Sequence, residues 1–283
     1  MSPFLRLVEA CNNHPGLHTL QPWLIDGQVA GYLAPAAAAT LAGLPGWQPQ
    51  PCGLALAVPA AARAATLAAG AAALGARHRA ELFDVRATPE GPALAVLDRG
   101  AIPAFGVIGQ GVHVNGLVRR AGGLHVWVGW RSRTKSVAPG QLDNLVAGGT
   151  PAGLGPWECL VKEAEEEASI PAELARQARP VAQIAYVMQV PEGTRRDVMH
   201  VYDLDLPESF TPQPNDNEVE RFELWPVGRL FAQVRDAGQV KFNVNLALLD
   251  LFLREGLIAA DSAEGLALRQ ALRRPLQRLT GAD

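Results

Sequence analysis

One segment, from the glycine pair Gly148-Gly149 to Pro171, constrains the fold more than any other. Pro156 suits the first turn of a helix, and Pro171 lies just past Ser169, where that helix should end. The apolar residues of this helix fall on one face at spacings of three and four: Leu160, Val161, Ala164 and Ala168. An apolar segment ends at the glycine pair, shortly before the helix. We therefore predict a helix packed on a sheet, and an α+β fold.

The chain changes in character near Phe105. Before it, Asp26-Gly27 lies between two β-type segments, which indicates a hairpin. Helices are expected near residues 4–10, 35–41 and 59–74, and two more strands near 81–85 and 93–97. After it, we expect strands near 112–119, 124–128, 142–146, 181–190, 199–206 and 219–225, and closing helices near 227–236, 243–255 and 263–279. We predict a small α+β N-terminal domain of unassigned role over residues 1–104, and a second domain over residues 105–283.

Three carboxylates cluster on a second face of the predicted helix: Glu163, Glu166 and Glu167. Exposed like charges at this spacing repel by roughly a few tenths of a kcal/mol per pair, and a divalent cation reverses that sign. Mg²⁺ and Mn²⁺ prefer such oxygen ligands. A solvated acidic face is the alternative. The glycine pair favours a binding site, because glycines let backbone amides approach an anion near a helix N-terminus.

The segment resembles the signature of the Nudix hydrolases: Gly, any five, Glu, any seven, then Arg-Glu-apolar-any-Glu-Glu-any-Gly-apolar. Residues 162–170, with the sequence KEAEEEASI, match its second half, and Gly148 takes the place of its first glycine. Three positions depart from it. Lys162 replaces the arginine and its planar fork, Ser169 replaces the last glycine, and Leu154 replaces the first glutamate, so one outer carboxylate is missing.

The resemblance extends over most of residues 105–257, to a Nudix branch with an extra N-terminal domain. That branch is related to the Nudix module associated with thiamine pyrophosphokinase. The segments that carry this resemblance are Gly111–Gly116, Lys135, Pro139–Asn144 and Asp216–Glu220. The resemblance implies the Nudix α/β/α sandwich around a mixed sheet, preceded by the small N-terminal domain.

The resemblance also implies a metal site and a general base. The expected ligands of Mg²⁺ or Mn²⁺ are Glu163, Glu166 and Glu167. The proton of the attacking water would pass to Glu163 or to Glu218, with Glu220 in reserve. The bound metal would neutralise the diphosphate and lower the pKa of bound water.

Four further residues are candidates for substrate binding. Gly148 and Gly149 would approach the phosphates through their backbone amides. Lys135 would contact a phosphate, or it is an ordinary surface lysine. Asn144 would orient the glycine pair, or it stabilises a turn. The chain has only three lysines, Lys135, Lys162 and Lys241, which draws attention to each of them.

These residues predict a metal-dependent hydrolase that splits a small organic diphosphate into a monophosphate and phosphate. Thiamine diphosphate or a damaged analogue is the substrate that the branch resemblance favours. Two alternatives stay open. A non-catalytic Nudix-fold binding module would explain Leu154. An isomerase of isoprenoid diphosphates would need a cysteine on a strand near histidine ligands, and neither Cys11 nor Cys159 is so placed.

Composition limits the classes of partner that we expect this chain to bind and the cellular compartment in which we expect it. A net charge of −3 carries no electrostatic footprint for nucleic acid. The apolar stretch from Ala55 to Ala76 contains Pro59 and Arg63, which indicates an alanine-rich helix rather than a membrane span. The three cysteines match no zinc spacing, and no leader segment is evident, so we expect a cytoplasmic protein with reduced thiols. Its expected partner is the small diphosphate, with neither nucleic acid nor membrane, and a homodimer is left open.

Overall fold

The N-terminal half is built from short elements. The computed structural model describes residues 2–273. A four-stranded sheet of order β2-β1-β4-β3 comes first, and a separate hairpin of β5 and β6 follows. The elements are α1 (Pro3–Cys11), η1 (Leu17–Thr19), β1 (Gln21–Ile25), β2 (Gln28–Leu33), α2 (Pro35–Ala42), β3 (Trp47–Gln50), β4 (Gly53–Leu56), α3 (Ala60–Ala73), β5 (Leu82–Val85), β6 (Ala95–Asp98), η2 (Arg99–Ala101) and α4 (Ile102–Phe105).

A seven-stranded mixed sheet organises the rest of the described chain. Its main order is β11-β12-β7-β8-β13, with β10 paired to β7 and β9 paired to β8. Strands β7 and β12 run parallel, and the other pairs are antiparallel. The elements are β7 (Ile108–Arg120), β8 (Gly123–Arg131), β9 (Leu142–Asp143), β10 (Val146–Gly149), α5 (Pro156–Ala168), α6 (Ala172–Ala175), β11 (Arg179–Val190), β12 (Gly193–Asp205), β13 (Val219–Pro226), α7 (Val227–Asp236), α8 (Val244–Arg254) and α9 (Ala263–Arg273).

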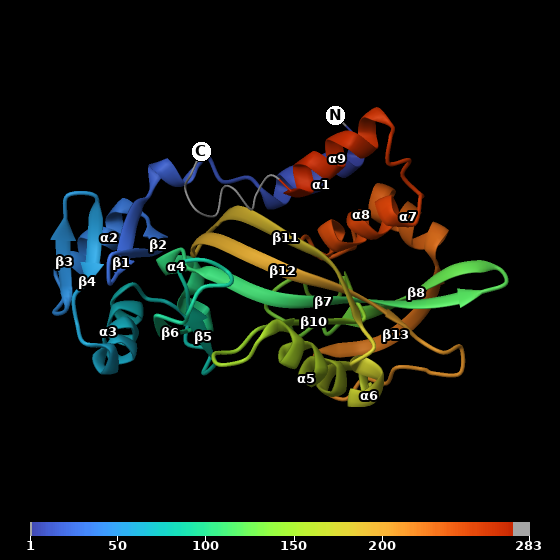
Figure 1. Cartoon of the computed structure of the whole chain (residues 1–283), viewed down its shortest axis with the longest axis horizontal. Coiled ribbons are helices and arrows are strands. Elements are labelled where there is room, and N and C mark those ends of the chain that lie inside the picture. Colours follow the sequence, from blue (N-terminus) through green and yellow to red (C-terminus); the bar gives the residue numbers. More distant parts are fainter. Residues whose placement is uncertain (1, 274–283) are drawn as a thin grey trace.

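Helices cover both faces of the large sheet (Figure 1). Successive side chains of a strand point to opposite faces. On β7, Leu117 therefore joins the core under α1, α7, α8 and α9, whereas Val118 joins the core under α5. On β12, Val201 and Tyr202 divide in the same way. The predicted α/β/α sandwich around a mixed sheet is confirmed.

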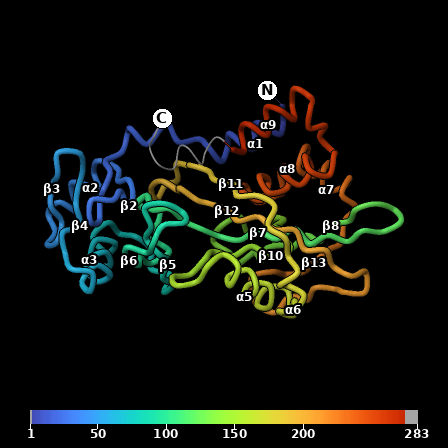
Figure 2. The backbone as a smooth tube through the Cα atoms, in the orientation of Figure 1, coloured from blue at the N-terminus to red at the C-terminus, as the bar shows by residue number. Residues whose placement is uncertain are grey.

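The first helix, α1, packs on the C-terminal helices rather than on the nearby four-stranded sheet. From α1 the chain passes along β11, as Figure 2 shows, before it enters that sheet. Asn12 Oδ1 accepts a hydrogen bond from Val187 N–H at 3.2 Å, and Asn13 Oδ1 accepts one from Gln189 N–H at 2.8 Å. The predicted domain boundary after residue 104 stays a prediction.

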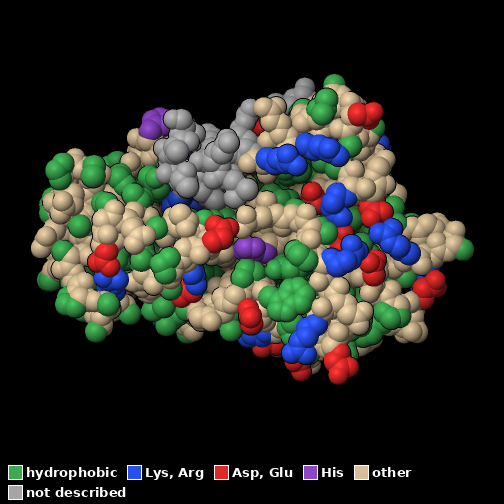
Figure 3. Space-filling model, in the orientation of Figure 1, with side chains coloured by type: hydrophobic (Ala, Val, Ile, Leu, Met, Phe, Trp, Pro, Cys, Tyr) green, Lys and Arg blue, Asp and Glu red, His purple; other side chains and the backbone are tan. Residues whose placement is uncertain are grey.

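Helix α4 joins the two halves. Trp23 of β1 donates its indole N–H to the carbonyl of Phe105 at 2.8 Å. Arg196 of β12 donates to the carbonyl of Gly106 at 2.9 Å, and its guanidinium lies 4.6 Å from the centre of the Tyr32 ring. Both bonds end on consecutive carbonyls at the end of α4. On the face in Figure 3, acidic and basic side chains of the described residues are intermixed.

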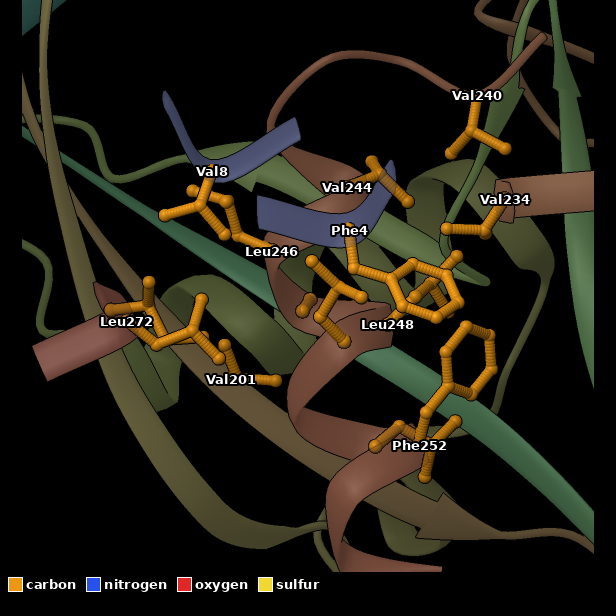
Figure 4. Packing of buried hydrophobic residues seen from close by; sticks show 14 of the residues in the cluster. Phe4, Val8, Val201, Val234, Val240, Val244, Leu246, Leu248, Phe252 and Leu272 are labelled. Carbon is orange, nitrogen blue, oxygen red and sulfur yellow. The ribbon is translucent and has the colours of Figure 1, made fainter. Parts of the chain in front are cut away.

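The core between α1 and the C-terminal helices is apolar (Figure 4). Phe4 and Val8 of α1 are buried there together with Leu248 and Phe252 of α8 and Leu272 of α9. Phe231 of α7 contacts both phenylalanine rings edge to face, with centroids 5.2 Å apart in each pair. Within residues 2–273, no helix has the length and apolar character that crossing a bilayer requires.

Most predicted elements are present. The hairpin turns at Asp26-Gly27, where both residues have positive φ, 49° and 76°. The strand expected over 142–146 is wrong in detail, because Asn144 and Leu145 separate β9 from β10, and β10 continues to Gly149. The last predicted helix is confirmed over Ala263–Arg273, and its remainder lies outside the described residues.

Candidate functional site

Two carboxylates of helix α5, those of Glu163 and Glu167, lie against the end of β10. The carboxyl group of Glu163 lies over Gly148, where an added Cβ atom would come within 2.3 Å of the Glu163 carboxyl carbon. One turn further on, Glu167 is buried, and its Oε2 accepts a hydrogen bond from Ala147 N–H at 2.9 Å. Gly148 is therefore needed to admit Glu163, a reason for glycine that the sequence did not reveal.

The third predicted ligand, Glu166, points away from β10. Its side chain is half exposed and forms an i,i+4 ion pair with Lys162, whose Nζ also lies 3.2 Å from Glu163 Oε1. Within residues 2–273, no three acidic, histidine or cysteine side chains lie together in an arrangement that could hold a metal ion. The assignment of Glu163, Glu166 and Glu167 as a ligand set therefore stays a prediction.

Glu218 approaches the two buried carboxylates from the loop before β13. Its side chain pairs with Lys135, and its backbone carbonyl accepts a hydrogen bond from Ser132 N–H at 2.8 Å. Glu220, the reserve candidate, turns instead to the backbone of Arg133, 3.0 Å away. The structure thus brings Glu218 and Lys135 to the site and leaves Glu220 outside it.

The electrostatics of these groups differ. Burial raises the pKa of Glu163, against the opposing charge of Lys162. Burial raises the pKa of Glu167 well above its usual range, although the Ala147 N–H opposes it, and the charges of Glu163 and Glu218 add to the rise. Burial would also raise the pKa of Glu218, but the ion pair with Lys135 outweighs it and lowers that pKa.

The carboxylates at this site fit a hard divalent cation. Their oxygens are the donors that Mg²⁺ and Mn²⁺ prefer. Burial and the charges of neighbouring carboxylates raise the pKa values of Glu163 and Glu167, so the ionised form of each is destabilised. A cation would remove both penalties by stabilising the ionised forms.

Asp143 is a member of the site that the sequence analysis did not single out. It is buried between Arg131 and Lys241, with Lys241 Nζ 3.0 Å from Asp143 Oδ2. Burial would raise the pKa of Asp143, but these two cations hold it below its usual value, and its charge raises the pKa of Glu167. All three lysines of the chain therefore pair with acidic groups at or beside the site.

Asn144 lies in a buried polar network behind β10. Its Oδ1 is 2.9 Å from His113 Nδ1, and its Nδ2 donates to Asn115 Oδ1 at 2.8 Å. Asn115 in turn donates to Asp203 Oδ1 at 2.9 Å, and Asp203 is paired with Arg254 of α8. The side chain of Asn144 thus braces β7, β12 and α8, while its predicted role in substrate binding stays a prediction.

Gly149, the other predicted phosphate-binding glycine, packs against the N-terminal half. A Cβ atom there would lie 2.5 Å from the ring of Phe83 in β5. Leu154, at the position of the missing signature glutamate, lies in the loop before α5 and lines a cavity rather than the carboxylate cluster. The β5–β6 hairpin therefore reaches the edge of the site.

Two of the three cysteines, Cys11 and Cys159, lie in environments that suppress reactivity, whereas Cys52 is exposed. Cys159 is buried under α5, and its Sγ lies 3.4 Å from the carbonyl oxygen of Gly149. Burial, with the charge of Glu163, raises the pKa of Cys159 to about 12. Burial also raises the pKa of Cys11 to about 12. Neither thiol is a nucleophile at neutral pH, so the isomerase alternative gains no support.

Comparisons with known proteins agree with this architecture. Residues 109–244 match the family model described as NUDIX domain. Nudix hydrolase 20, chloroplastic, from Arabidopsis thaliana is 42% identical over 195 residues, which are 69% of this chain and 52% of that protein. Nudix hydrolase 24, chloroplastic, from the same plant is 42% identical over 69% of this chain and 53% of its own length.

A third relative, the uncharacterized protein YJR142W of Saccharomyces cerevisiae, is 30% identical over 59% of this chain and 53% of its own length. The chain thus spans about half the length of the curated relatives that it matches. Among solved structures, the crystal structure of DR0079 from Deinococcus radiodurans aligns with a TM-score of 0.46 and 24% identity, over 60% of this chain and 98% of that chain.

Proposed function

We propose that the chain, whose residues 109–244 match the NUDIX domain model, is a metal-dependent hydrolase of a small organic diphosphate. The observation that carries the proposal is a pair of carboxylates held against the end of β10, the half-buried Glu163 and the buried Glu167. Their burial is costly unless a cation compensates for it. An exposed acidic face, the alternative considered for this helix, would not bury Glu167.

Glu163 and Glu167 would hold the cation, with Glu218 close by. A bound Mg²⁺ or Mn²⁺ neutralises phosphate charge and lowers the pKa of an attached water. Glu166 would join only if its side chain left Lys162. Lys135 would exchange its ion pair with Glu218 for a phosphate oxygen of the substrate.

We assign proton acceptance to Glu163 in preference to Glu218. A general base works best when its pKa lies near the working pH. In the metal-free protein, burial shifts the pKa of Glu163 upward, whereas Lys135 shifts that of Glu218 downward; Glu163 would keep this advantage only through the carboxyl oxygen that does not bind the cation. Water would attack the terminal phosphorus, its proton would pass to Glu163, and the bridging P–O bond would break to give a monophosphate and orthophosphate.

The substrate that we propose first is thiamine diphosphate or a damaged analogue, on the strength of the sequence resemblance. Nucleoside diphosphate sugars are the competitors, since hydrolysis of nucleoside diphosphate-linked compounds is the broader expectation for a NUDIX enzyme. The cytoplasmic location and the homodimer stay predictions.

The test is a screen of both substrate classes at equal concentration with Mg²⁺ or Mn²⁺, with detection of phosphate and monophosphate products. We expect turnover that EDTA abolishes. A kcat/KM advantage of the sugar nucleotides above about tenfold, or about 1.4 kcal/mol of transition-state binding, would exclude the thiamine assignment. Metal-dependent binding without turnover of any diphosphate would favour the non-catalytic binding module.

A further inference from the structure

The β5–β6 hairpin is bonded to the NUDIX domain at several points. Ala152 N–H donates to the carbonyl of Leu82 at 2.7 Å, just after β10. Gln110 of β7 donates its side-chain amide to the carbonyl of Pro89 at 2.9 Å, and Gln183 of β11 donates to Glu90 Oε1 at 3.0 Å. These bonds attach both β5 and the loop between β5 and β6, so the hairpin is a fixed wall of the site.

A cavity of about 250 Å³ lies between this hairpin and the domain. Residues of both the hairpin and the domain line this cavity, among them Phe83, Asp84, Glu90, Gln110, Thr150 and His200. Leu154 and the first residue of α5, Pro156, close it from the side of the helix. The volume suits a heterocyclic ring and is too small for a large polymer segment.

The cavity lies within reach of the carboxylate pair. Thr150 directly follows β10, and its N–H donates to the carbonyl of Gln110 at 2.9 Å, which continues the pairing with β7. Residues two apart in a strand point to the same face and lie about 7 Å apart. Thr150 and Gly148, the residue under Glu163, are separated in this way, so a phosphate beside Glu163 would leave its attached group near the cavity.

Two polar groups of the lining, the buried Thr150 and the half-buried His200, have unused hydrogen-bonding capacity. Thr150 is nine-tenths buried, and its hydroxyl makes no hydrogen bond to a nitrogen or oxygen of the described residues; its neighbour, the Cys159 thiol, is only a weak partner. Gln110 donates its amide to Pro89, so its Oε1 accepts from His200 Nε2 at 2.8 Å. Burial lowers the pKa of His200, and the neutral ring keeps Nδ1 as an acceptor.

The charges around the cavity favour a ligand that donates hydrogen bonds. Asp84 and Glu90 are acidic, and the cation of the lining, Arg86, is already bound to Asp84 at 2.6 Å and to the carbonyl of Gly91. The lining therefore offers more acceptors than free donors. A second phosphate would be repelled there, whereas an amino-substituted ring would find partners.

We propose that this cavity binds the organic group of the diphosphate substrate, a heterocyclic ring that carries an amino group, and that the β5–β6 hairpin makes the N-terminal half a specificity element. The inference rests on the proposed hydrolase activity, because the ligand assigned to the cavity is the organic group of the diphosphate substrate. The binding of a ring-bearing monophosphate can nevertheless be measured without turnover, so the two proposals can fail separately.

The experiment fills the cavity with Leu154→Trp and uses Leu266→Trp as the matched control, because Leu266 is 58% exposed on α9. Calorimetry with AMP and with thiamine monophosphate reports binding. We expect Leu154→Trp to weaken it by about tenfold or more, and the control to leave it unchanged. In turnover, KM for the ring-bearing diphosphates should rise, while kcat/KM for inorganic diphosphate should stay the same.

A second variant, His200→Phe, keeps the size of the side chain and removes the acceptor. It should reduce the preference for AMP over inosine monophosphate, which has no amino group. Equal ligand affinities of Leu154→Trp and Leu266→Trp, or no binding of either monophosphate to the wild type at millimolar concentration, would overturn the proposal. Binding that Leu154→Trp abolishes in a protein without hydrolase activity would support the cavity and reject the proposed function.

Discussion

The interiors of the two halves differ in kind. The four-stranded N-terminal sheet is held by apolar packing around Trp23, Trp47 and Phe105, whose rings contact one another at 5.5 to 6.2 Å. The C-terminal half, which matches the NUDIX domain model over residues 109–244, buries charge: Asp143 and Glu167 lie inside it with their partners. Among the described residues, every fully buried polar side chain other than His14 comes after residue 105.

This contrast separates the residues that stabilise the fold from the residues that we propose for catalysis. Apolar packing lowers the free energy of the folded chain directly. Buried carboxylates raise it unless a partner or a ligand compensates. The polar interior of the C-terminal half is therefore the better guide to function, and the following variants test the distinction, beginning with the one of largest expected effect.

Glu163→Gln should lower kcat by about 10² to 10⁴-fold, the usual contribution of a positioned general base. The amide keeps the shape of the side chain over Gly148 and cannot accept the proton. Glu165→Gln on the exposed side of α5 is the control and should retain full activity. Steady-state kinetics on the preferred diphosphate decide the matter, and equal rates for the two variants would remove Glu163 from the mechanism.

Trp23→Ala should lower the free energy of unfolding by about 3–5 kcal/mol, since it empties a fully buried site in the N-terminal core. It also leaves the Phe105 carbonyl without the indole donor. Denaturant titration gives the loss. The kcat of the folded fraction should change little. A fall in kcat comparable to that of Glu163→Gln would show that the four-stranded sheet is not separable from the catalytic half.

Near neutral pH and without metal, Glu167→Gln should raise the free energy of unfolding. The gain should be about 1 kcal/mol for each unit by which the pKa of Glu167 in the folded protein exceeds its ordinary value. The raised pKa means that the folded state keeps a proton which the unfolded chain loses above its ordinary value of 4.5. Wild-type stability should therefore fall as pH rises from there through the folded pKa.

Thermal melts in EDTA across that pH range provide the measurement. As pH rises, the melting temperature of Glu167→Gln should increase relative to that of the wild type, whereas the melting temperature of Glu165→Gln should not. Mg²⁺ should then raise the wild-type melting temperature more than that of Glu167→Gln. A pH-independent difference between wild type and Glu167→Gln would mean that Glu167 is not titrating in the folded protein as its burial implies.

Features that depend on local chemistry could be predicted from the sequence. Asp26-Gly27 adopts left-handed backbone angles in the hairpin. Ser169, which replaces the last glycine of the signature, adopts the left-handed conformation that glycine favours, with φ of 53°, and α5 ends there as predicted. Local signals of this kind fix where elements begin and end.

Features that depend on contacts between distant elements could not be predicted. Helical spacing groups Glu163 with both Glu166 and Glu167. The side chains of Glu166 and Glu167, however, project about 100° apart around the axis of α5, and β10 lies on the side of Glu167. The partnership of Asp143 with Lys241 joins residues nearly a hundred positions apart. Only the scarcity of lysine pointed to Lys241, and nothing local placed the predicted strands of the β5–β6 hairpin beside the site.

The packing of α1 has a consequence for the order of events during synthesis. Phe4 and Val8 become buried in a core that α7, α8 and α9 supply together with strand β11. The roughly 230 residues between α1 and α8 take on the order of ten to fifty seconds to emerge from a ribosome. During that interval α1 presents an apolar stripe with no internal partner, which is the kind of segment that chaperones bind. The helix that is made early is thus among the last to be buried.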